Sequence, residues 1–214
     1  MEKVMREAII FWLSIILWCG NGAGCTPVWH TPILQGLPLT PGRYLTAYYQ
    51  SPDFKPVPAS YRLKDFSFEQ VTGVDKSLAE RFFREELLTA LENNGLPLKA
   101  QEADYTLAGQ VSQLHLRGPV LRYLSGKSQA TLKVAGVISR GPEVVYAFQD
   151  QVQVTWPINP RHPTSMESEL MVRQVMRRFA SDLLNEMLLP PPAPATAATS
   201  SPAPRDQGFM AEGG

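Results

Sequence analysis

The sequence predicts an α+β fold, in which a four-stranded, mostly antiparallel sheet has two helices packed on one face. Two segments repeat apolar residues at the 3.6-residue spacing of an amphipathic helix, and four segments alternate apolar and polar residues as half-buried strands do. Their order along the chain is β-α-β-β-β-α. We expect the second, third and fourth strands to form a meander and the first strand to pair beside them.

The first helix is predicted over residues 77–94. Ser77 and Glu80 have the spacing of a capping box, and Asn94-Gly95 supplies a left-handed stop. Its apolar stripe consists of Leu78, Phe82, Phe83, Leu87, Leu88 and Leu91.

The second helix is predicted over residues 165–189, with a capping box formed by Thr164 and Glu167. Pro190 to Pro192 stop it, because proline cannot continue a helix. We expect its arginines to face solvent; these are Arg173, Arg177 and Arg178.

The strands are predicted over residues 60–71, 104–117, 128–139 and 144–156. A step of three between Leu63 and Phe66 predicts a bulge or break near Lys64–Asp65 in the first strand. A second slip is expected at Ser112–Gln113.

Two residues of these strands predict special surroundings. Gly109 has no side chain, so we expect a close neighbour there, the first helix. Alternation places Asp150 on the same side of the fourth strand as its apolar residues. Burial of an unpaired carboxylate costs much free energy, so we expect the strand either to bend at Asp150 or to leave the core there.

The N-terminal segment Ala8 to Cys25 predicts a secretion signal. Lys3 and Arg6 precede an apolar run that is too short for a membrane-spanning helix, and small residues follow it. Gly22-Ala23-Gly24-Cys25 resembles the lipobox of bacterial lipoproteins, which implies that Cys25 becomes the acylated N-terminus and anchors the protein in a membrane. An ordinary cleaved signal and an uncleaved anchor are the alternatives.

The chain is therefore divided into a signal peptide (1–24), a lipidated Pro-rich arm (25–58), an α+β domain (59–189) and a disordered tail (190–214). The tail is rich in Pro, Ala, Thr and Ser and has little apolar surface to bury. The arm carries aromatic residues that indicate docking, either on its own domain or on a partner; these are Trp29, Tyr44, Tyr48 and Tyr49.

The composition bears on function. The formal net charge of the 214 residues is +0, which argues against a nucleic-acid partner. The histidines, His30, His115 and His162, have no carboxylate or second histidine at metal-ligand spacing. We predict neither an enzyme nor a metal or other cofactor.

The element order, together with Ala103-Asp104-Tyr105-Thr106-Leu107-Ala108-Gly109-Gln110-Val111 after the first helix, resembles lipoproteins of the bacterial lipopolysaccharide-assembly family. This resemblance covers residues 60–189. It implies a non-enzymatic, periplasm-facing protein of the outer membrane, which assists lipopolysaccharide or lipid assembly with an outer-membrane barrel partner. Thr26 after the cysteine favours the outer membrane in that pattern. The alternatives are an auxiliary lipoprotein of an ABC-type lipid transport system and a structural envelope lipoprotein.

A candidate ligand surface lies between the second and third strands, in residues 116–127. Arg117, Arg122 and Lys127 stand there beside apolar residues, which suits an anionic amphiphile such as lipopolysaccharide or a membrane headgroup layer. Alternatively, these apolar residues cover the open end of the core.

Overall fold

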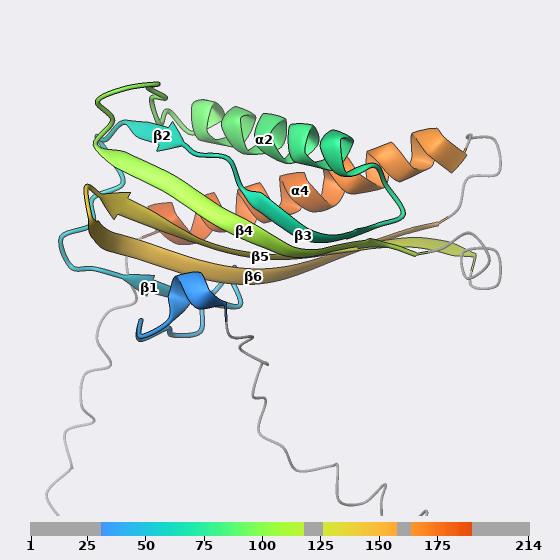
Figure 1. The fold of residues 1–214 in the computed structure, drawn as a ribbon, viewed down its shortest axis with the longest axis horizontal. Helices are drawn as coiled ribbons and strands as arrows, with labels where there is room; N and C mark the ends of the chain where they lie inside the picture. The colour runs from blue at the N-terminus through green and yellow to red at the C-terminus, as the bar shows by residue number, and fades with distance from the viewer. Residues whose placement is uncertain (1–30, 118–125, 158–163, 190–214) are drawn as a thin grey trace, which may run out of the picture.

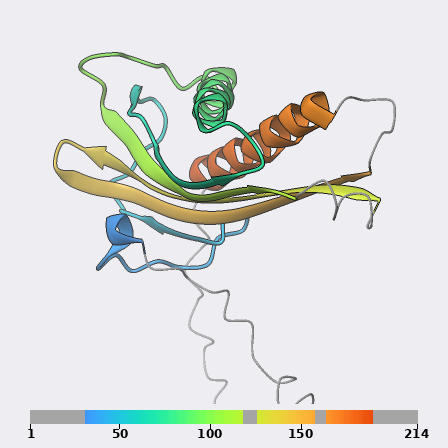
Figure 2. The ribbon, with the colours of Figure 1, turned by 45° about the vertical axis from the view of Figure 1, so that its right-hand side comes forward.

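A mixed sheet with two helices on one face forms the domain (Figures 1 and 2). The computed structural model describes residues 31–117, 126–157 and 164–189. Its elements, in chain order, are η1 (Pro32–Leu34), β1 (Ala47–Gln50), β2 (Tyr61–Leu63), β3 (Ser67–Thr72), α2 (Lys76–Asn93), β4 (Tyr105–Leu116), β5 (Lys127–Arg140), β6 (Glu143–Pro157) and α4 (Thr164–Leu188).

The sheet is built on the predicted meander, since β4, β5 and β6 pair antiparallel in sequence order. β1 pairs antiparallel with β6, whereas β2 and β3 both pair parallel with the other side of β4. The α+β class with two helices is confirmed. The strand number is wrong, because the sheet has six strands. The first predicted strand is divided into two, and residues 47–50 of the predicted arm add β1.

The division between β2 and β3 occurs where the sequence predicted a break. Leu63 pairs with Leu107 and Ser67 with Gln110, so the β2–β3 segment has one residue more than β4 over this stretch. The ring of Phe66 lies against Gly109, where a Cβ would collide with it. The prediction that the first helix is the close neighbour of Gly109 is therefore wrong. The predicted slip in β4 is confirmed by a register shift at Ser112.

Helix α2 begins at a different cap from the predicted one. The carboxylate of Asp75 accepts a hydrogen bond from the backbone N–H of Leu78 at 2.9 Å, and the Ser77 hydroxyl donates to the same carboxylate at 2.6 Å. The predicted capping box of Ser77 and Glu80 is therefore wrong, because Asp75 is an equally good acceptor and precedes Ser77. Gly95, with φ of +71°, follows the helix end as expected.

Helix α4 is tied to the sheet at its first turn. The Ser128 hydroxyl of β5 donates to the Glu167 carboxylate at 2.8 Å. The side chain of Thr164 lies outside the described residues, so the capping box of this helix stays a prediction.

The core between the helices and the sheet is aromatic. The ring of Phe83 on α2 lies 5.6 Å from that of Phe179 on α4, and Phe179 lies 5.9 Å from Phe148 on β6. All three side chains are at most 3% exposed. Burial of each such side chain contributes about 1.5–3 kcal/mol to stability, so these contacts hold the helices on the sheet.

The arginines of α4 form ion pairs that the sequence did not reveal. Arg173 and Arg177 donate to the buried carboxylate of Glu86 on α2 at 2.9–3.2 Å. Burial raises the pKa of Glu86, but the hydrogen bonds and charges of the two arginines together outweigh it, so this pKa lies below its ordinary value. Arg178 pairs within its own helix, with Asp182 at 2.8 Å.

Residues 33–39 of the predicted arm pack on the face of the sheet opposite the helices. Leu34 of η1 packs there on Ala135 and Ala147, within a cluster that also contains Ile33, Leu37, Leu39, Tyr49, Val137 and Val144. Figure 1 shows η1 on that side, whereas β1 is the edge strand of the sheet beside β6. Of the two interpretations of the arm, docking on its own domain is confirmed for these residues.

Several predicted features lie outside the described residues. These are the signal peptide, the lipid-attachment Cys25, the disordered tail and Arg122. Within residues 31–117, 126–157 and 164–189, neither helix combines the length and the apolar character needed to cross a membrane.

Candidate functional site

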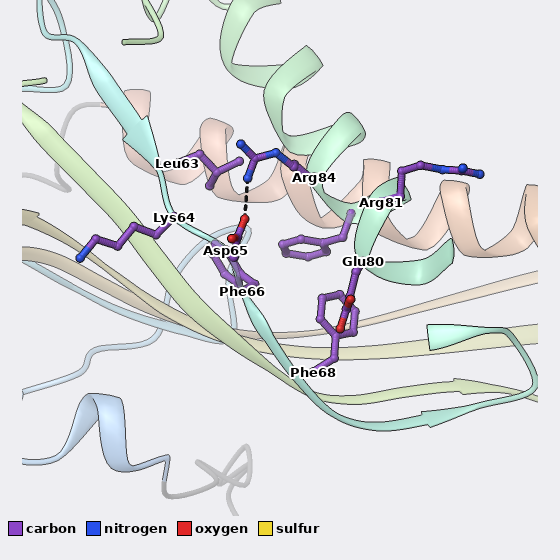
Figure 3. Close-up of a pocket in the computed structure, with 9 residues that line it drawn as sticks. Leu63, Lys64, Asp65, Phe66, Phe68, Glu80, Arg81 and Arg84 are labelled. Carbon is purple, nitrogen blue, oxygen red and sulfur yellow. Dashed lines mark hydrogen bonds and ion pairs between the residues drawn. The ribbon is translucent and has the colours of Figure 1, made fainter. Parts of the chain in front are cut away.

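A groove between helix α2 and the break from β2 to β3 is a candidate site (Figure 3). Its volume is about 450 Å³. The extra residue between β2 and β3 opens it, because the chain leaves β4 at Asp65 and Phe66 and returns to it at Ser67. The groove is lined by Leu63, Lys64, Asp65, Phe66, Phe68, Glu80, Arg81, Phe83 and Arg84.

Three phenylalanine rings form the apolar part of the groove. The ring centroids of Phe66 and Phe83 lie 4.9 Å apart, and those of Phe68 and Phe83 lie 5.6 Å apart, edge to face. These side chains are 3–9% exposed, so most of their surface already belongs to the core. The groove therefore has a rigid aromatic wall that suits alkyl or other apolar groups.

One ion pair spans the opening of the groove. Arg84 on α2 donates to Asp65 in the β2–β3 break at 2.7 Å, and Figure 3 shows this pair above the ring of Phe66. The side chain of Asp65 is 94% exposed. An exposed pair contributes at most about 1 kcal/mol, so an anionic ligand group can replace Asp65 as the partner of Arg84.

Further charges flank this pair. Arg81 pairs loosely with Glu85 at 3.8 Å, and Lys76 with Glu80 at 3.9 Å. Among the described residues, no side-chain partner contacts the Lys64 ammonium group, which extends away from the opening in Figure 3. With an aromatic wall and exchangeable cations, the site can bind an anionic amphiphile.

The residues predicted as ligand contacts lie elsewhere. Arg117 follows the last residue of β4, and its backbone N–H donates to Gln129 at 2.9 Å. Lys127 begins β5, opposite Pro157 of β6. Arg117 and Lys127 thus flank the same β4–β5 connection, as predicted, whereas Arg122 lies outside the described residues. Ligand binding by the three residues stays a prediction.

Sequence reasoning missed the groove, although it located the break that creates it. The step from Leu63 to Phe66 was the available signal, because a shifted register turns consecutive apolar residues to the same side of a strand. The partner side chains Phe83 and Arg84 come from α2, about twenty residues later. Only the packing of α2 over the break brings them together.

A second polar cluster binds the arm, beside an open cavity of about 520 Å³ that Tyr44, Asp150 and Arg178 help to line. The buried carboxylate of Glu186 accepts hydrogen bonds from the backbone N–H groups of Tyr44 at 2.6 Å and Leu45 at 3.3 Å. Asp150 accepts from the backbone N–H and the hydroxyl of Thr46, both at 3.1 Å. Neither predicted alternative for Asp150 is correct: β6 continues through it, and the arm provides its partners.

Asp150 remains only partly satisfied. Its Oδ2 atom is buried and has no hydrogen-bond partner among the described residues. Burial raises the pKa of this carboxyl, and the hydrogen bonds from Thr46 compensate only in part. Within the described part of the chain, no group of three or more His, Cys, Asp and Glu side chains is placed to hold a metal ion.

No protein-family model and no curated protein matches the sequence. The chain is similar to several solved structures. One is a protein of Xanthomonas campestris, which is 14% identical with a TM-score of 0.44; the match covers 63% of this chain and 86% of that protein. The minor lipoprotein of Acinetobacter baumannii is 13% identical, with a TM-score of 0.39 over 58% of this chain and 92% of its own.

Rare lipoprotein B of Shewanella oneidensis is 17% identical, with a TM-score of 0.36 over 56% of this chain and 92% of its own. At these identities and TM-scores the likeness assigns no family. The function therefore has to be inferred from the chain's own residues.

Proposed function

We propose that this chain is a lipid-anchored, non-enzymatic protein of the bacterial envelope, which binds an anionic amphiphile and assists outer-membrane lipopolysaccharide or lipid assembly through a membrane-protein partner. The sequence supports the anchor, because a short apolar run and small residues precede Cys25. Thr26 supports the outer membrane as the final location.

The observation that carries the ligand part is that the exposed Arg84–Asp65 pair lines the same groove as the rings of Phe66 and Phe83. An acyl chain that packs on the rings would remove its own apolar surface from water, at about 25 cal/mol per Å² buried. The rings contribute little of this surface, because they are only 3–9% exposed. A phosphate or carboxylate of the same molecule would then reach Arg84, where a charge-assisted hydrogen bond replaces the exposed pair with Asp65. The groove therefore suits a molecule that has both parts.

The anchor is tested by changing Cys25 to Ser. The mutant protein is expected in the soluble periplasmic fraction, whereas the wild type fractionates with membranes. A mutant that stays with the membrane as before contradicts lipid attachment at this cysteine.

The ligand site is tested with the full-length Cys25→Ser protein and vesicles that contain lipopolysaccharide or anionic phospholipid. Arg84→Ser is expected to weaken binding at least tenfold, which corresponds to about 1.4 kcal/mol. Asp65→Ala is the matched control, because it removes the competing carboxylate and leaves the cations. It is expected to strengthen binding.

The same assay separates the two candidate surfaces. The triple change of Arg117, Arg122 and Lys127 to Ser tests the β4–β5 connection, and weakening by this variant alone would move the site there. Glycerol phosphate, which has the anionic group without acyl chains, is expected not to compete. Absence of binding by the parent protein contradicts the ligand role and leaves protein–protein assembly, for which a co-purified barrel protein or ABC permease would identify the partner.

A further inference from the structure

The strand β6 extends well beyond its neighbour β1. β6 runs from Glu143 to Pro157, but β1 pairs with it only from Tyr146 to Gln149. Thr46, just before β1, contacts β6 one step further along, because its hydroxyl accepts a hydrogen bond from the backbone N–H of Gln151 at 3.2 Å. Among the described residues, no strand covers this side of β6 from Val152 to Pro157.

The hydrogen-bonding direction of this edge follows from β1. The backbone N–H and C=O of Tyr48 bond to Thr40, so the Tyr48–Phe148 pair exchanges no hydrogen bonds. The neighbouring residues Ala147 and Gln149 therefore point their backbone groups towards β1, and Gln151 does the same. By the same alternation, Gln153 and Thr155 present N–H and C=O groups to the open side, where no described residue bonds to them.

The chemistry of the edge invites pairing. Gln151 to Trp156, with the sequence QVQVTW, contains no charged residue and no proline. The opposite edge is protected, because β2 and β3 are short and the ammonium group of Lys76 binds the carbonyl oxygen of Phe68 at 2.8 Å. Sheet edges without such protection template association with another strand.

The side chains of the edge are sorted by face. The helix side of the strand carries every second residue from the buried Phe148 onward, which includes Val152, Val154 and Trp156. The side chain of Trp156 is 47% exposed. Gln151, Gln153 and Thr155 lie on the other side. A strand that paired here would meet an apolar row on one face and an uncharged polar row on the other.

We propose that a second copy of this chain pairs with this edge, so that two β6 strands run antiparallel about a two-fold axis at Val154. Val154 then faces its own copy, and Val152 faces Trp156 of the second copy. Gln153 faces Thr155 of the second copy, and these residues exchange backbone hydrogen bonds. The two sheets become one continuous sheet.

The register is self-consistent at both ends. Gln151 faces Pro157 of the second copy, and neither residue has a free N–H, since Thr46 already accepts that of Gln151 and proline has none. Pairing therefore ends there without a buried, unsatisfied donor. Val152 of each copy covers the exposed indole of Trp156 in the other copy. Because the paired segments contain no charged residue, identical strands do not repel each other.

The oligomeric state of the detergent-solubilised full-length protein, measured by light scattering, tests this pairing. Gln153→Pro removes an outward N–H and leaves the ladder to β5 intact, and Val154→Lys places two ammonium groups face to face. Both variants are expected to raise the dimer dissociation constant at least tenfold. Thr155→Ala keeps the backbone N–H and is the matched control, with a dimer like that of the wild type.

Cross-linking tests the register. Val154→Cys is expected to form a disulfide-linked dimer under mild oxidation, because the two-fold axis places the two Cβ atoms of a non-hydrogen-bonded pair close together. Gln70→Cys, on the exposed part of β3, is the control and should stay uncross-linked. A monomeric wild type, or a dimer that Gln153→Pro and Val154→Lys leave unchanged, overturns the proposal and leaves the edge to a strand of another protein.

Discussion

The two faces of the sheet are covered in different ways. Large rings fill the layer under the helices, where Phe83, Phe148 and Phe179 are almost fully buried. The opposite face has the small residues Ala135 and Ala147 under Leu34. The two helices leave room for large rings against the sheet, whereas η1 packs close to it over these two alanines.

The attachment of residues 44–46, next to the edge strand β1, depends on hydrogen bonds that come from the helix side of the sheet. Residues 44–46 are held by the carboxylates of Glu186 and Asp150, which accept from backbone N–H groups. Gln149, fully buried beneath the arm, has neither amide atom bonded among the described residues. Because buried polar groups without partners reduce stability, we expect the arm to detach more readily than the helices.

The largest effect is expected in the helix layer. Phe179→Ala removes the ring that contacts both Phe83 and Phe148, and it should lower the free energy of unfolding by about 3–5 kcal/mol. Urea denaturation of the full-length Cys25→Ser protein measures this. A loss below about 1 kcal/mol would contradict the assignment of this layer as the main source of stability.

A smaller and local effect is expected for Glu186→Ala. The change leaves the N–H groups of Tyr44 and Leu45 without their acceptor, which costs about 1–3 kcal/mol. Amide hydrogen exchange should accelerate in residues 42–50 and stay unchanged in β4 and α2. Glu186→Gln keeps an acceptor oxygen and is the control; uniform acceleration throughout the domain would show that residues 42–50 do not open independently of the rest.

Asp150→Asn is expected to stabilise the protein by about 1 kcal/mol at pH 8, because the amide avoids burying a charge and still accepts from Thr46. The pKa of Asp150 is raised by burial in the folded state. The folded state therefore binds the proton more tightly than the unfolded state, and stability falls as pH rises from the unfolded pKa, about 3.9, through the raised one.

Urea midpoints from pH 4 to pH 8 test this dependence. The Asn variant lacks the carboxyl, so its advantage over the wild type should grow with pH. An advantage that is constant over this range would exclude titration of Asp150 as its cause.

The smallest effect is expected at the groove. Asp65→Ala removes the exposed pair with Arg84, and the free energy of unfolding should change by less than about 0.5 kcal/mol. Thermal denaturation measures it. A larger loss would show that the pair holds α2 in place, and the use of Asp65→Ala as a binding control would then be invalid.

The local elements followed from the sequence, because each depends on contacts between residues close in the chain. Apolar spacing predicted both helices and the long meander, and the step from Leu63 to Phe66 predicted the division of the edge strand. The cap of α2 was misassigned by two residues, since Asp75 and Ser77 are both good acceptors and spacing alone could not choose between them.

The sequence by itself determined which residues alternate, the bounds of both helices to within a residue or two, and that a signal-like segment precedes Cys25. Only the tertiary structure decided that part of the Pro-rich arm becomes β1, that Asp150 and Glu186 bind this arm, and that Phe83 and Arg84 complete a groove with Phe66. These pairs are separated by about 20 to 140 residues. Their contacts depend on the whole chain folding back on the sheet, and no local pattern encodes which distant backbone N–H group will meet a buried carboxylate.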